Sequence, residues 1–494
     1  MFPFKSIVAI DKSHKSPVYL QIVNSFIREI NLGRLVPGQR LPGSREMARL
    51  LELNRKTVIM AYEELMAQGW IEIHASRGSF ISGELPKVKH QEITPQSGWK
   101  GKPALDKCGF TITPNPKLVT PLYTDHNLLE IDEGSPDERL APVAYLYRYC
   151  KGIAKSKAGR KLLKYHDVQG ELSLRRALSR YLADTRGLNY PAENIFITRG
   201  SQMAIYLLFN VLIQRGAHVV VGSTNYGAAN AVIRNMGAHL LTVPVDEHGI
   251  VVSEIEKICN KARVSAVYIT PHHHFPTTVT LSAQRRIELL KLAEQYRFAI
   301  LEDDYDYDYH YSSSPILPLA SLDQQGLVIY VGAFSKLLAP SIRIGYLVAP
   351  TELITALKPL RRIVDRQGDP IMEMAIAEMI KDGEIQRHLK KTVKIYKKRR
   401  DLFCRLLKDN LGKHVSFKIP EGGMVVWACF GPHIDPEQLA AELKRKRLVI
   451  NIQKDFVSQH NAVRFGFASL NEEEIHRSIT LLRETVEALF GHRV

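Results

Sequence analysis

Short apolar runs alternate with longer helical patterns from Ile131 to the end of this 494-residue chain, and this alternation restricts the fold more than any other feature. The runs are Ile195–Thr198, His218–Val221, Ala266–Ile269, Ala299–Leu301, Val328–Val331 and Tyr346–Val348. Strands that alternate with helices form parallel sheets that carry helices on both faces. We therefore expect an α/β domain with a mostly parallel sheet, in which ligands bind beyond the carboxyl ends of the strands.

Two groups of residues follow these runs in places that suit a ligand. Ser201 and Gln202 follow the first run and precede an apolar helix over Ala204–Leu212, and the backbone N–H groups at a helix start bind phosphate. Ser201 is equally consistent with an ordinary helix N-cap. Tyr226 follows the second run, where a flat ring would either stack on a cofactor or pack in the core. Neither position identifies a ligand by itself.

Lys336 and the carboxylate upstream of it form the most specific pattern. Asp303 ends the apolar stretch before Lys336, and Arg343 follows the lysine closely. A lysine that forms a Schiff base with pyridoxal phosphate needs a carboxylate on the pyridine nitrogen, because that pair makes the ring an electron sink. It also needs a cation near the phosphate, which Arg343 would provide. The three residues are those that a pyridoxal phosphate site would need.

The first 85 or so residues follow another pattern. Helical patterns begin at Pro17, Ser44 and Arg55, and two short strands follow over Trp70–Ile73 and Ser79–Ile81. We expect Ser44 to be the N-cap of the second helix. Three short helices and a hairpin describe a winged helix-turn-helix, whose DNA-reading helix presents polar and basic residues at its N-terminal end. Arg55 and Lys56 fit that role, although charged helix ends are also common on solvated surfaces.

The net charge of +16 suits an anionic partner, but the charge is unevenly distributed. Most of the excess lies in Lys151–Lys164 and Lys390–Arg400 rather than in the first 86 residues. Each stretch is consistent with a solvated basic surface, which we prefer, or with contact to a phosphate backbone. The five cysteines show no CxxC spacing, and the chain has no signal-peptide pattern or apolar run that would span a bilayer. We expect a cytoplasmic protein with reduced thiols.

Residues 85–127 are rich in Pro, Gly and Lys and show no sustained periodicity, which is typical of a linker. Within them, we expect Phe110–Thr113 to be a short strand. A flexible linker of this length spans roughly 35–40 Å. That distance is about one turn of DNA, ~34–36 Å, so the two winged helices of a dimer would reach adjacent major grooves.

The N-terminal region resembles the GntR family of bacterial repressor domains. The matching motifs are Pro17-x-Tyr19, Gly33-Arg34-Leu35-x-Pro37-Gly38, Ser44-Arg45-Glu46, Arg55-x-Thr57-Val58 and Ala61-Tyr62-Glu63-x-Leu65. By this resemblance, Arg45, Arg55, Lys56 and Thr57 would contact double-stranded DNA, and Arg77 and Gly78 would form the wing tip near the minor groove. The resemblance does not separate the contacts that read bases from those that hold phosphate.

The large region resembles the aminotransferase-like half of the MocR regulators, a GntR subfamily, and the run from Gly332 to Tyr346 resembles the lysine loop of fold-type I aminotransferases. Further matches are Gly134-x-Pro136-Asp137, Tyr165-x-x-x-x-Gly170, Gly187-Leu188 and Gly422-Gly423-Met424. The resemblance implies a role for each site residue. Ser201, Gln202 and Arg343 would hold the phosphate, Tyr226 would stack on the ring and Asp303 would pair with the pyridine nitrogen. Tyr305 would bond the phenolic oxygen, Lys336 would be the Schiff-base residue and Arg464 would receive an effector carboxylate. A guanidinium suits that last role because it binds a carboxylate through two hydrogen bonds.

The sequence departs from the family pattern at two places. Ala333 stands where the family usually bears a hydroxyl for the phosphate, so we expect weaker cofactor binding. In Pro271–Thr278, Phe275 and His273 match the regulators rather than the enzymes, whereas His272, His274 and Thr278 match neither. The consecutive histidines do not predict a metal site, because adjacent side chains on an extended segment point in alternating directions. Asp304, Asp306 and Asp308 read as a polar loop rather than a metal site.

These features predict three parts: a winged helix-turn-helix over 1–84, a linker over 85–127 and a fold-type I, aminotransferase-like domain over 128–494. By resemblance, the protein is a homodimeric transcription regulator that senses pyridoxal phosphate or an amino compound through an aldimine at Lys336. One alternative is an active aminotransferase with an appended DNA-binding domain, because nearly all the catalytic residues are present. The other is a cofactor-free DNA-binding dimer, which only Ala333 favours.

Overall fold

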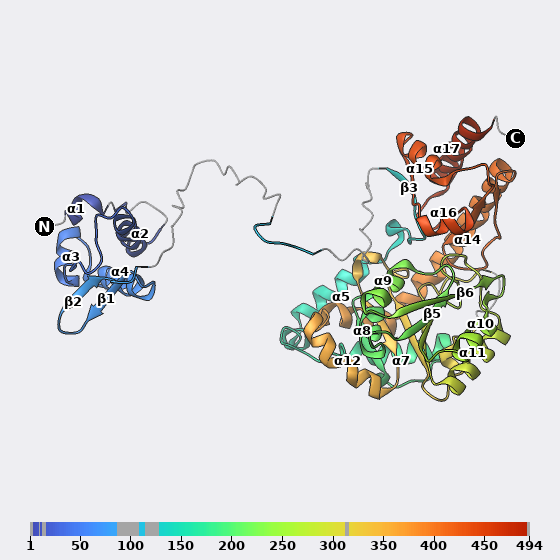
Figure 1. The fold of residues 1–494 in the computed structure, drawn as a ribbon, viewed down its shortest axis with the longest axis horizontal. Coiled ribbons are helices and arrows are strands. Elements are labelled where there is room, and N and C mark those ends of the chain that lie inside the picture. The colour runs from blue at the N-terminus through green and yellow to red at the C-terminus, as the bar shows by residue number, and fades with distance from the viewer. Residues whose placement is uncertain are drawn as a thin grey trace. The chain divides into compact units, whose positions relative to one another are not determined.

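The structure is a computed structural model that describes residues 3–8, 10–11, 16–85, 108–113, 128–311 and 316–491. The chain divides into two compact units, Met1–Ile112 and Thr113–Val494 (Figure 1). Most of the expected linker, residues 86–107 and 114–127, lies outside the described residues. The strand expected over Phe110–Thr113 is wrong, because none of these residues pairs in a sheet and the side chains of Phe110 and Ile112 are exposed.

The first unit contains the three helices and the hairpin that its sequence predicts. Its elements are α1 (Phe4–Ile7), α2 (Val18–Asn31), α3 (Ser44–Leu51), α4 (Arg55–Ala67), β1 (Ile71–His74) and β2 (Gly78–Ile81), with β1 and β2 antiparallel. Buried apolar residues of every helix and of the hairpin form one core, centred on Phe26, Met47, Val58 and Trp70. The short helix α1 was not predicted, although its Phe4 stacks on Phe26 in that core.

The expected N-cap of α3 is wrong. Gly43 is the N-cap, and Ser44 is the first residue with helical conformation. The Ser44 hydroxyl instead accepts a hydrogen bond from Arg55 Nε at 3.4 Å, which connects the first turns of α3 and α4. In α4 the capping follows the usual chemistry, since the Asn54 side chain accepts a hydrogen bond from the backbone N–H of Lys56.

The second unit is built on a seven-stranded sheet with strand order β4-β12-β11-β10-β9-β5-β6. The strands are β4 (Ile195–Thr198), β5 (His218–Gly222), β6 (His239–Val243), β9 (Val264–Ile269), β10 (Ala299–Asp303), β11 (Val328–Ala333) and β12 (Gly345–Val348). All pairings are parallel except those of β12, which runs antiparallel to β4 and β11. The six predicted runs all lie in this sheet, which confirms a mostly parallel α/β fold.

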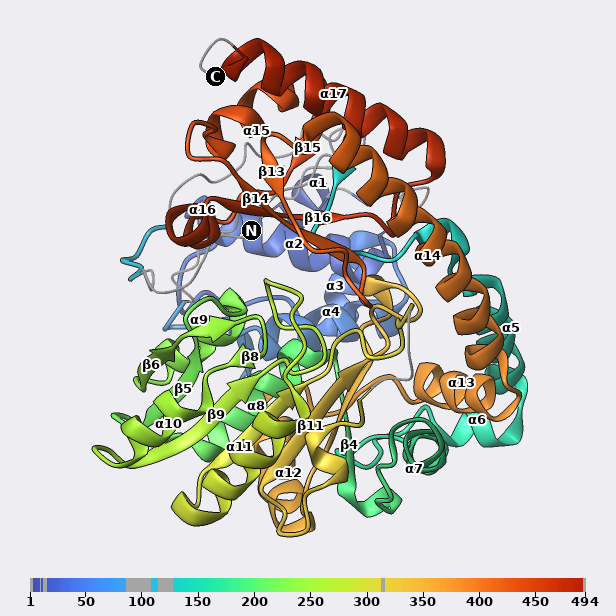
Figure 2. The same ribbon diagram turned by 90° about the vertical axis from the view of Figure 1, so that its right-hand side faces the viewer.

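Helices cover both faces of the sheet (Figure 2). On one face, Phe196, Tyr268 and Leu301 pack against α8 (Ser201–Leu212), α9 (Gly227–Asn235) and α12 (Thr351–Val364). Alternate residues of the same strands, such as Ile197 and Val267, pack on the opposite face. The helices there are α5 (Val143–Lys155), α7 (Leu172–Arg186), α10 (Val252–Cys259), α11 (Ala283–Tyr296) and α13 (Pro370–Lys381). Burial on both faces explains why the strands are apolar throughout.

A smaller layer with its own core lies beside this sheet. It contains α14 (Glu384–Leu411), β13 (Val415–Ser416), β14 (Val425–Phe430), α15 (Pro436–Arg445), β15 (Leu448–Ile450), α16 (Lys454–His460), β16 (Ala462–Gly466) and α17 (Glu472–Phe490). An early segment of the unit also belongs to it, because β3 (Leu129–Ile131) pairs in parallel with β15. This pairing brings the residues that follow β3 to the same place as those that follow β15.

The remaining elements are short: α6 (Lys157–Lys161), β7 (Val245–Asp246), β8 (Gly249–Ile250) and 3-10 turns at Glu138–Leu140, Ala192–Asn194, Leu319–Ser321 and Pro340–Ile342. The basic stretch Lys390–Arg400 is only partly a solvated surface. Its last two residues are buried, with Arg399 paired to Asp137 and Arg400 to Asp401. Among the helices of the described residues, none is both long and apolar enough to cross a membrane.

Candidate ligand cavity and DNA-binding elements

A cavity of about 390 Å³ gathers most of the predicted site residues of the large unit. Six of them line it: Ser201, Tyr226, Asp303, Tyr305, Lys336 and Arg464. Ser201 begins α8, Asp303 ends β10 and Lys336 follows β11, so the cavity lies where strands of the sheet meet their following helices and loops. Arg464 comes from β16 of the smaller layer. Gln202 and Arg343 do not line the cavity.

Asp303 lines the cavity, and its two carboxylate oxygens differ in their hydrogen bonding. Its Oδ2 accepts a hydrogen bond from the Tyr268 hydroxyl at 2.6 Å, whereas Oδ1 is buried without a hydrogen-bond partner among the described residues. Burial raises the pKa of Asp303 to about 6, and the Tyr268 hydrogen bond opposes that rise. Tyr268 was missed from the sequence, because it lies inside β9 and reads there as an ordinary aromatic strand residue.

Lys336 is held by the backbone of a distant segment. Its Nζ donates a hydrogen bond of 2.6 Å to the carbonyl oxygen of Gly134, in the loop after β3. Burial lowers the pKa of Lys336, while the nearby Asp132 carboxylate opposes that change. A lysine with a lowered pKa keeps more of its amine neutral, and the neutral amine is the nucleophilic form.

Arg343 lies at the start of α8, where Ser201 is the first helical residue. The N-cap of this helix is Gly200, not Ser201, so the expected alternative of Ser201 as a simple N-cap is wrong. Arg343 Nη2 donates to the carbonyl oxygen of Arg199, and a Cβ on Gly200 would lie 2.9 Å from the same nitrogen. The guanidinium therefore lies against the helix start, where backbone N–H groups and a cation together suit a phosphate.

Two tyrosines of the cavity are positioned by local contacts. The Tyr226 hydroxyl donates to Gln202 Oε1 at 3.2 Å, and its ring packs edge-on against Phe275. Gln202 thus positions Tyr226 from outside the cavity. The Tyr305 hydroxyl donates to the carbonyl oxygen of His273 at 3.0 Å. Burial raises the pKa of Tyr305, which keeps its hydroxyl protonated and able to donate.

One guanidinium nitrogen of Arg464 makes no hydrogen bond within the described residues and could bind an anion. It is 2% exposed, its Nη1 donates to the Pro276 carbonyl oxygen at 3.0 Å, and its guanidinium lies 4.1 Å from the centre of the Phe275 ring. Its Nε has no hydrogen-bond partner within the described part of the chain, and no carboxylate there forms an ion pair with it. A buried arginine in this state suits a ligand carboxylate.

The acidic run after β10 is a polar loop, as predicted, and its carboxylates bond side chains of other segments. Asp304 accepts a hydrogen bond from Tyr330, Asp306 bonds His273 Nδ1 at 2.8 Å, and Asp308 pairs with Arg186. The consecutive histidines bond different groups: His272 the carbonyl oxygen of Ile316, His273 the Asp306 carboxylate and His274 the Thr277 hydroxyl. No cluster of three metal-ligating side chains occurs among the described residues.

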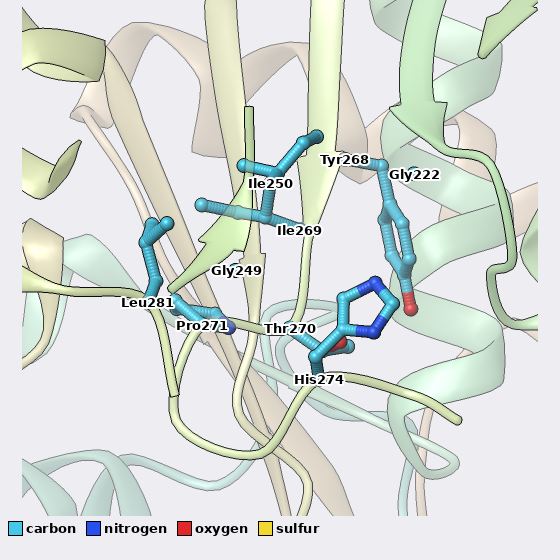
Figure 3. Close-up of a pocket in the computed structure, with 9 residues that line it drawn as sticks. All are labelled: Gly222, Gly249, Ile250, Tyr268, Ile269, Thr270, Pro271, His274 and Leu281. Carbon is cyan, nitrogen blue, oxygen red and sulfur yellow. The ribbon is translucent and has the colours of Figure 1, made fainter. Parts of the chain in front are cut away.

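A second, much smaller cavity of about 10 Å³ lies next to the first and shares Tyr268 and Thr270 with it. Figure 3 shows the His274 ring beside the Tyr268 ring, with Ile269 and Leu281 on the other side. The volume is enough for about one water molecule. Burial lowers the pKa of His274 to about 3, so its imidazole is neutral at physiological pH.

The predicted DNA-contacting residues lie on α3, α4 and the hairpin of the first unit. Arg45, Arg55 and Lys56 are exposed, and Thr57 is half-buried in the first turn of α4. Arg77 is exposed in the turn between β1 and β2, and Gly78 has φ +100°, a conformation that favours glycine. Arg40, which was not predicted, lies beside this turn, with its guanidinium near Gly78.

Two family models match the chain. The model for aminotransferase class I and II matches residues 146–482, and the model for bacterial regulatory proteins of the gntR family matches residues 18–81. The protein named "Probable rhizopine catabolism regulatory protein MocR" from Rhizobium meliloti is 27% identical over 98% of this chain and 96% of its own length. An uncharacterized HTH-type transcriptional regulator of Bacillus subtilis, YdfD, is 28% identical over 95% of this chain and 96% of its own length.

The large unit is also similar to solved aminotransferase structures. Pyrococcus horikoshii kynurenine aminotransferase, solved in complex with PMP, superposes with a TM-score of 0.68 at 28% identity. The match covers 73% of this chain and 91% of the enzyme. The fold of the large unit is therefore that of fold-type I aminotransferases.

The residues that line the cavity fit pyridoxal phosphate, the cofactor of this family. The free, buried Oδ1 of Asp303 is an acceptor for a pyridine N–H, and the α8 start with Ser201 and Arg343 offers donors for the phosphate. Lys336 supplies an amine to the same cavity. Ala333, at the end of β11, adds no hydroxyl to this set.

A DNA-binding domain and a cofactor-binding domain thus occur in one chain, in the order found in the full-length relatives. The chain belongs to the aminotransferase class I and II family through its large unit and, with the gntR-family domain before it, to the MocR subfamily of GntR transcription regulators.

Proposed function

We propose that this regulator senses pyridoxal phosphate, or an amino compound that binds together with it, in the cavity of the large unit. One observation carries the proposal: a buried carboxylate oxygen of Asp303 and a buried guanidinium nitrogen of Arg464 both lack partners among the described residues, and both residues line the cavity that holds Lys336. Unpartnered buried polar groups are costly, and a ligand that bonds them removes that cost.

Each residue has a separate task in this proposal. Asp303, oriented by Tyr268, accepts a hydrogen bond from the pyridine nitrogen, while Ser201 and Arg343 hold the phosphate. When bound, pyridoxal phosphate supplies an aldehyde that combines reversibly with amines. Lys336 supplies the resident amine, and its lowered pKa favours the neutral form. Arg464 binds the carboxylate of the incoming amino compound.

We also propose that the protein binds paired DNA half-sites as a homodimer through its large unit. Several large apolar side chains of that unit are exposed, among them Tyr145 and Tyr147 on α5, Tyr165, and Ile363 on α12. Arg366 lies over the Tyr165 ring at 3.8 Å, which connects two of these segments. Burial of such side chains against a second copy would remove them from water.

The first test is the visible absorption spectrum of the purified protein with added pyridoxal phosphate, beside the variants Lys336→Ala and Lys291→Ala. Lys291 is an exposed lysine of α11, so it controls for non-specific attachment. We expect a cofactor band in the parent and in Lys291→Ala that Lys336→Ala lacks. A parent protein without the band at excess cofactor contradicts the proposal.

The second test measures binding to duplex DNA that the protein itself selects from a random pool, by fluorescence anisotropy. We expect the affinity to change when pyridoxal phosphate, or an amine together with it, is added to the parent but not to Lys336→Ala. If neither addition changes the affinity for DNA, the sensing part of the proposal is contradicted and only the DNA-binding part stands. Sustained turnover of an amino acid with a keto acid would instead support a catalytic function.

A further inference from the structure

The small cavity is connected with the ligand cavity through two shared side chains. Tyr268 and Thr270 line both cavities, whereas His274 lines only the small one. Figure 3 shows the hydroxyl end of Tyr268 beside the His274 ring. The Tyr268 hydroxyl also bonds Asp303, so a group in the small cavity can act on the carboxylate of the ligand cavity through one side chain.

His274 directs one ring nitrogen at the small cavity. Its Nδ1 forms a hydrogen bond of 3.0 Å with the Thr277 hydroxyl. Its Nε2 has no hydrogen-bond partner in the part of the chain that the structure describes. A Cβ on Gly222, which lines the same cavity, would lie 3.0 Å from this Nε2. The unpartnered nitrogen is therefore on the side of the ring that faces the small cavity.

The His274 ring is neutral, so one of its nitrogens donates and the other accepts. Burial, with smaller contributions from the charges of Arg464 and His460, lowers the pKa of His274 to about 3. The hydrogen bond at one nitrogen of a neutral imidazole decides where the proton lies. When the Thr277 hydroxyl donates to Nδ1, the N–H is at Nε2 and faces the small cavity.

The polar atoms around the small cavity suit one bound water molecule. A buried water typically makes about three hydrogen bonds, and three residues offer them here. His274 has its Nε2, and the Tyr268 oxygen keeps a lone pair after it donates to Asp303. Thr270 Oγ1 accepts the backbone N–H of Phe275 and still has its own O–H to donate. A hydroxyl that accepts a hydrogen bond becomes a stronger donor, because bonds in a chain polarise one another.

We propose that His274 is a positioning residue of the cofactor site: its Nε2–H, through one water molecule in the small cavity, holds the Tyr268 hydroxyl on Oδ2 of Asp303. This inference rests on the proposed function and adds a residue to its site. With Oδ2 held by Tyr268, Oδ1 is the oxygen that accepts the pyridine N–H. Loss of one neutral hydrogen bond from this chain lowers the affinity for pyridoxal phosphate about fivefold.

The test compares two amides of different reach at position 274. In His274→Gln the amide nitrogen lies about where Nε2 is, whereas in His274→Asn it lies about where Nδ1 is. The asparagine therefore keeps a polar partner for Thr277 but does not reach the small cavity. Full-length, cofactor-free protein is titrated with pyridoxal phosphate, and the visible cofactor band gives the affinity. We expect His274→Asn to bind about fivefold more weakly than the parent, and His274→Gln to bind within about twofold of it.

A second variant shows whether His274 acts through Tyr268. Tyr268→Phe removes the hydroxyl and should weaken cofactor binding at least as much as His274→Asn does. When Tyr268→Phe is already present, the added His274→Asn should change the affinity by less than about twofold. A histidine that only fills space would instead lower the affinity by the same factor in both backgrounds. The control is His414→Asn, because His414 is a half-buried histidine that lines neither cavity, and it should leave the affinity unchanged.

Three results would overturn the inference while the proposed function stands. The first is a His274→Asn or Tyr268→Phe protein that binds the cofactor as tightly as the parent. The second is an equal loss of affinity in His274→Asn and His274→Gln, which would assign His274 to packing alone. The third is an effect of His274→Asn that is undiminished in Tyr268→Phe. A parent protein without any cofactor band would overturn both the inference and the proposed function.

Discussion

The hydroxyl of Tyr268 donates a hydrogen bond of 2.6 Å to Oδ2 of Asp303 and so fixes a buried carboxylate whose other oxygen has no partner among the described residues. The carboxylate is 4% exposed, and burial raises its pKa to about 6. A group in this state destabilises the cofactor-free protein, which is a common property of binding sites that are formed before their ligand arrives.

Asp303→Asn should therefore stabilise the cofactor-free protein and weaken cofactor binding. In the unfolded chain the carboxyl ionises near pH 3.8, whereas in the folded protein it keeps its proton up to about pH 6. The loss of folding stability caused by burying the charge therefore grows as the pH rises between these two values, and it reaches its full size above pH 6. It amounts to roughly 3 kcal/mol at neutral pH.

Thermal melting of the cofactor-free variant and parent at pH 4 and pH 7.5 measures this difference. The gain in Tm should be larger at pH 7.5, and titration with pyridoxal phosphate should show an affinity at least about tenfold lower. Asp409→Asn, on the exposed side of α14, is the control and should change neither quantity. A variant that melts no higher than the parent at pH 7.5 would contradict the assigned cost of Asp303.

Replacement of Ala333 should tighten cofactor binding when the new side chain carries a hydroxyl. Ala333 ends β11, opposite Gly345 of β12, and is partly accessible. Ala333→Thr and Ala333→Val add the same volume and the same β-branch, but only threonine can donate to a phosphate. We expect the threonine variant to bind pyridoxal phosphate about tenfold more tightly than the valine variant. Equal affinities would show that the phosphate does not reach this position.

Thr278 occupies a backbone conformation that suits glycine. Its φ is +63°, in the left-handed region that a β-branched residue rarely adopts, and its backbone N–H bonds the His274 carbonyl oxygen. Thr278→Gly should raise the free energy of unfolding by about 1 kcal/mol, because relief of the strain exceeds the added flexibility of the unfolded chain. Thr278→Ala keeps a Cβ in the same backbone conformation, so it should raise the free energy of unfolding by less than Thr278→Gly. Thermal melting of the three proteins decides between these expectations, and a glycine variant that melts below the parent would exclude stored strain.

The sheet was predictable because its strands are buried on both faces and so read as continuous apolar runs. The strand that was missed, β6, is at the edge of the sheet, and its His239 and Thr242 are exposed. Local sequence could not show the pairing of β3 with β15 either, because it joins segments more than 300 residues apart.

The site was predictable where a residue's chemistry is unusual for its place in the chain. Asp303 ends a strand, Lys336 follows one, and both carry charge, so they stand out. Tyr268 is an ordinary strand aromatic in the sequence, and only the structure shows that its hydroxyl bonds Asp303. The sequence did not identify the partners of Asp306 and Asp308, because His273 and Arg186, which bind them, lie far away in the sequence.

Arg55→Ala and Lys56→Ala should each weaken binding to DNA. Both side chains are exposed in the first turn of α4, where Asn54 caps the helix and the Ser44 hydroxyl bonds Arg55. A residue that contacts only phosphate contributes equally to all sequences, and its loss lowers the slope of log affinity against log salt by about 1. A residue that reads a base instead costs about 1–3 kcal/mol on the selected sequence and relaxes specificity at one position.

Fluorescence anisotropy over a range of salt concentrations, on selected and scrambled duplexes, separates these two outcomes for each residue. Arg28→Ala is the matched control, since Arg28 is a cation of the same unit that lies on α2 and pairs with Glu29. It should change neither affinity nor salt slope, provided that circular dichroism shows the helices intact. If Arg55→Ala and Lys56→Ala bind both duplexes as the parent does, the first turn of α4 does not face DNA, and the exposed cations Arg45, Arg40 and Arg77 become the residues to test.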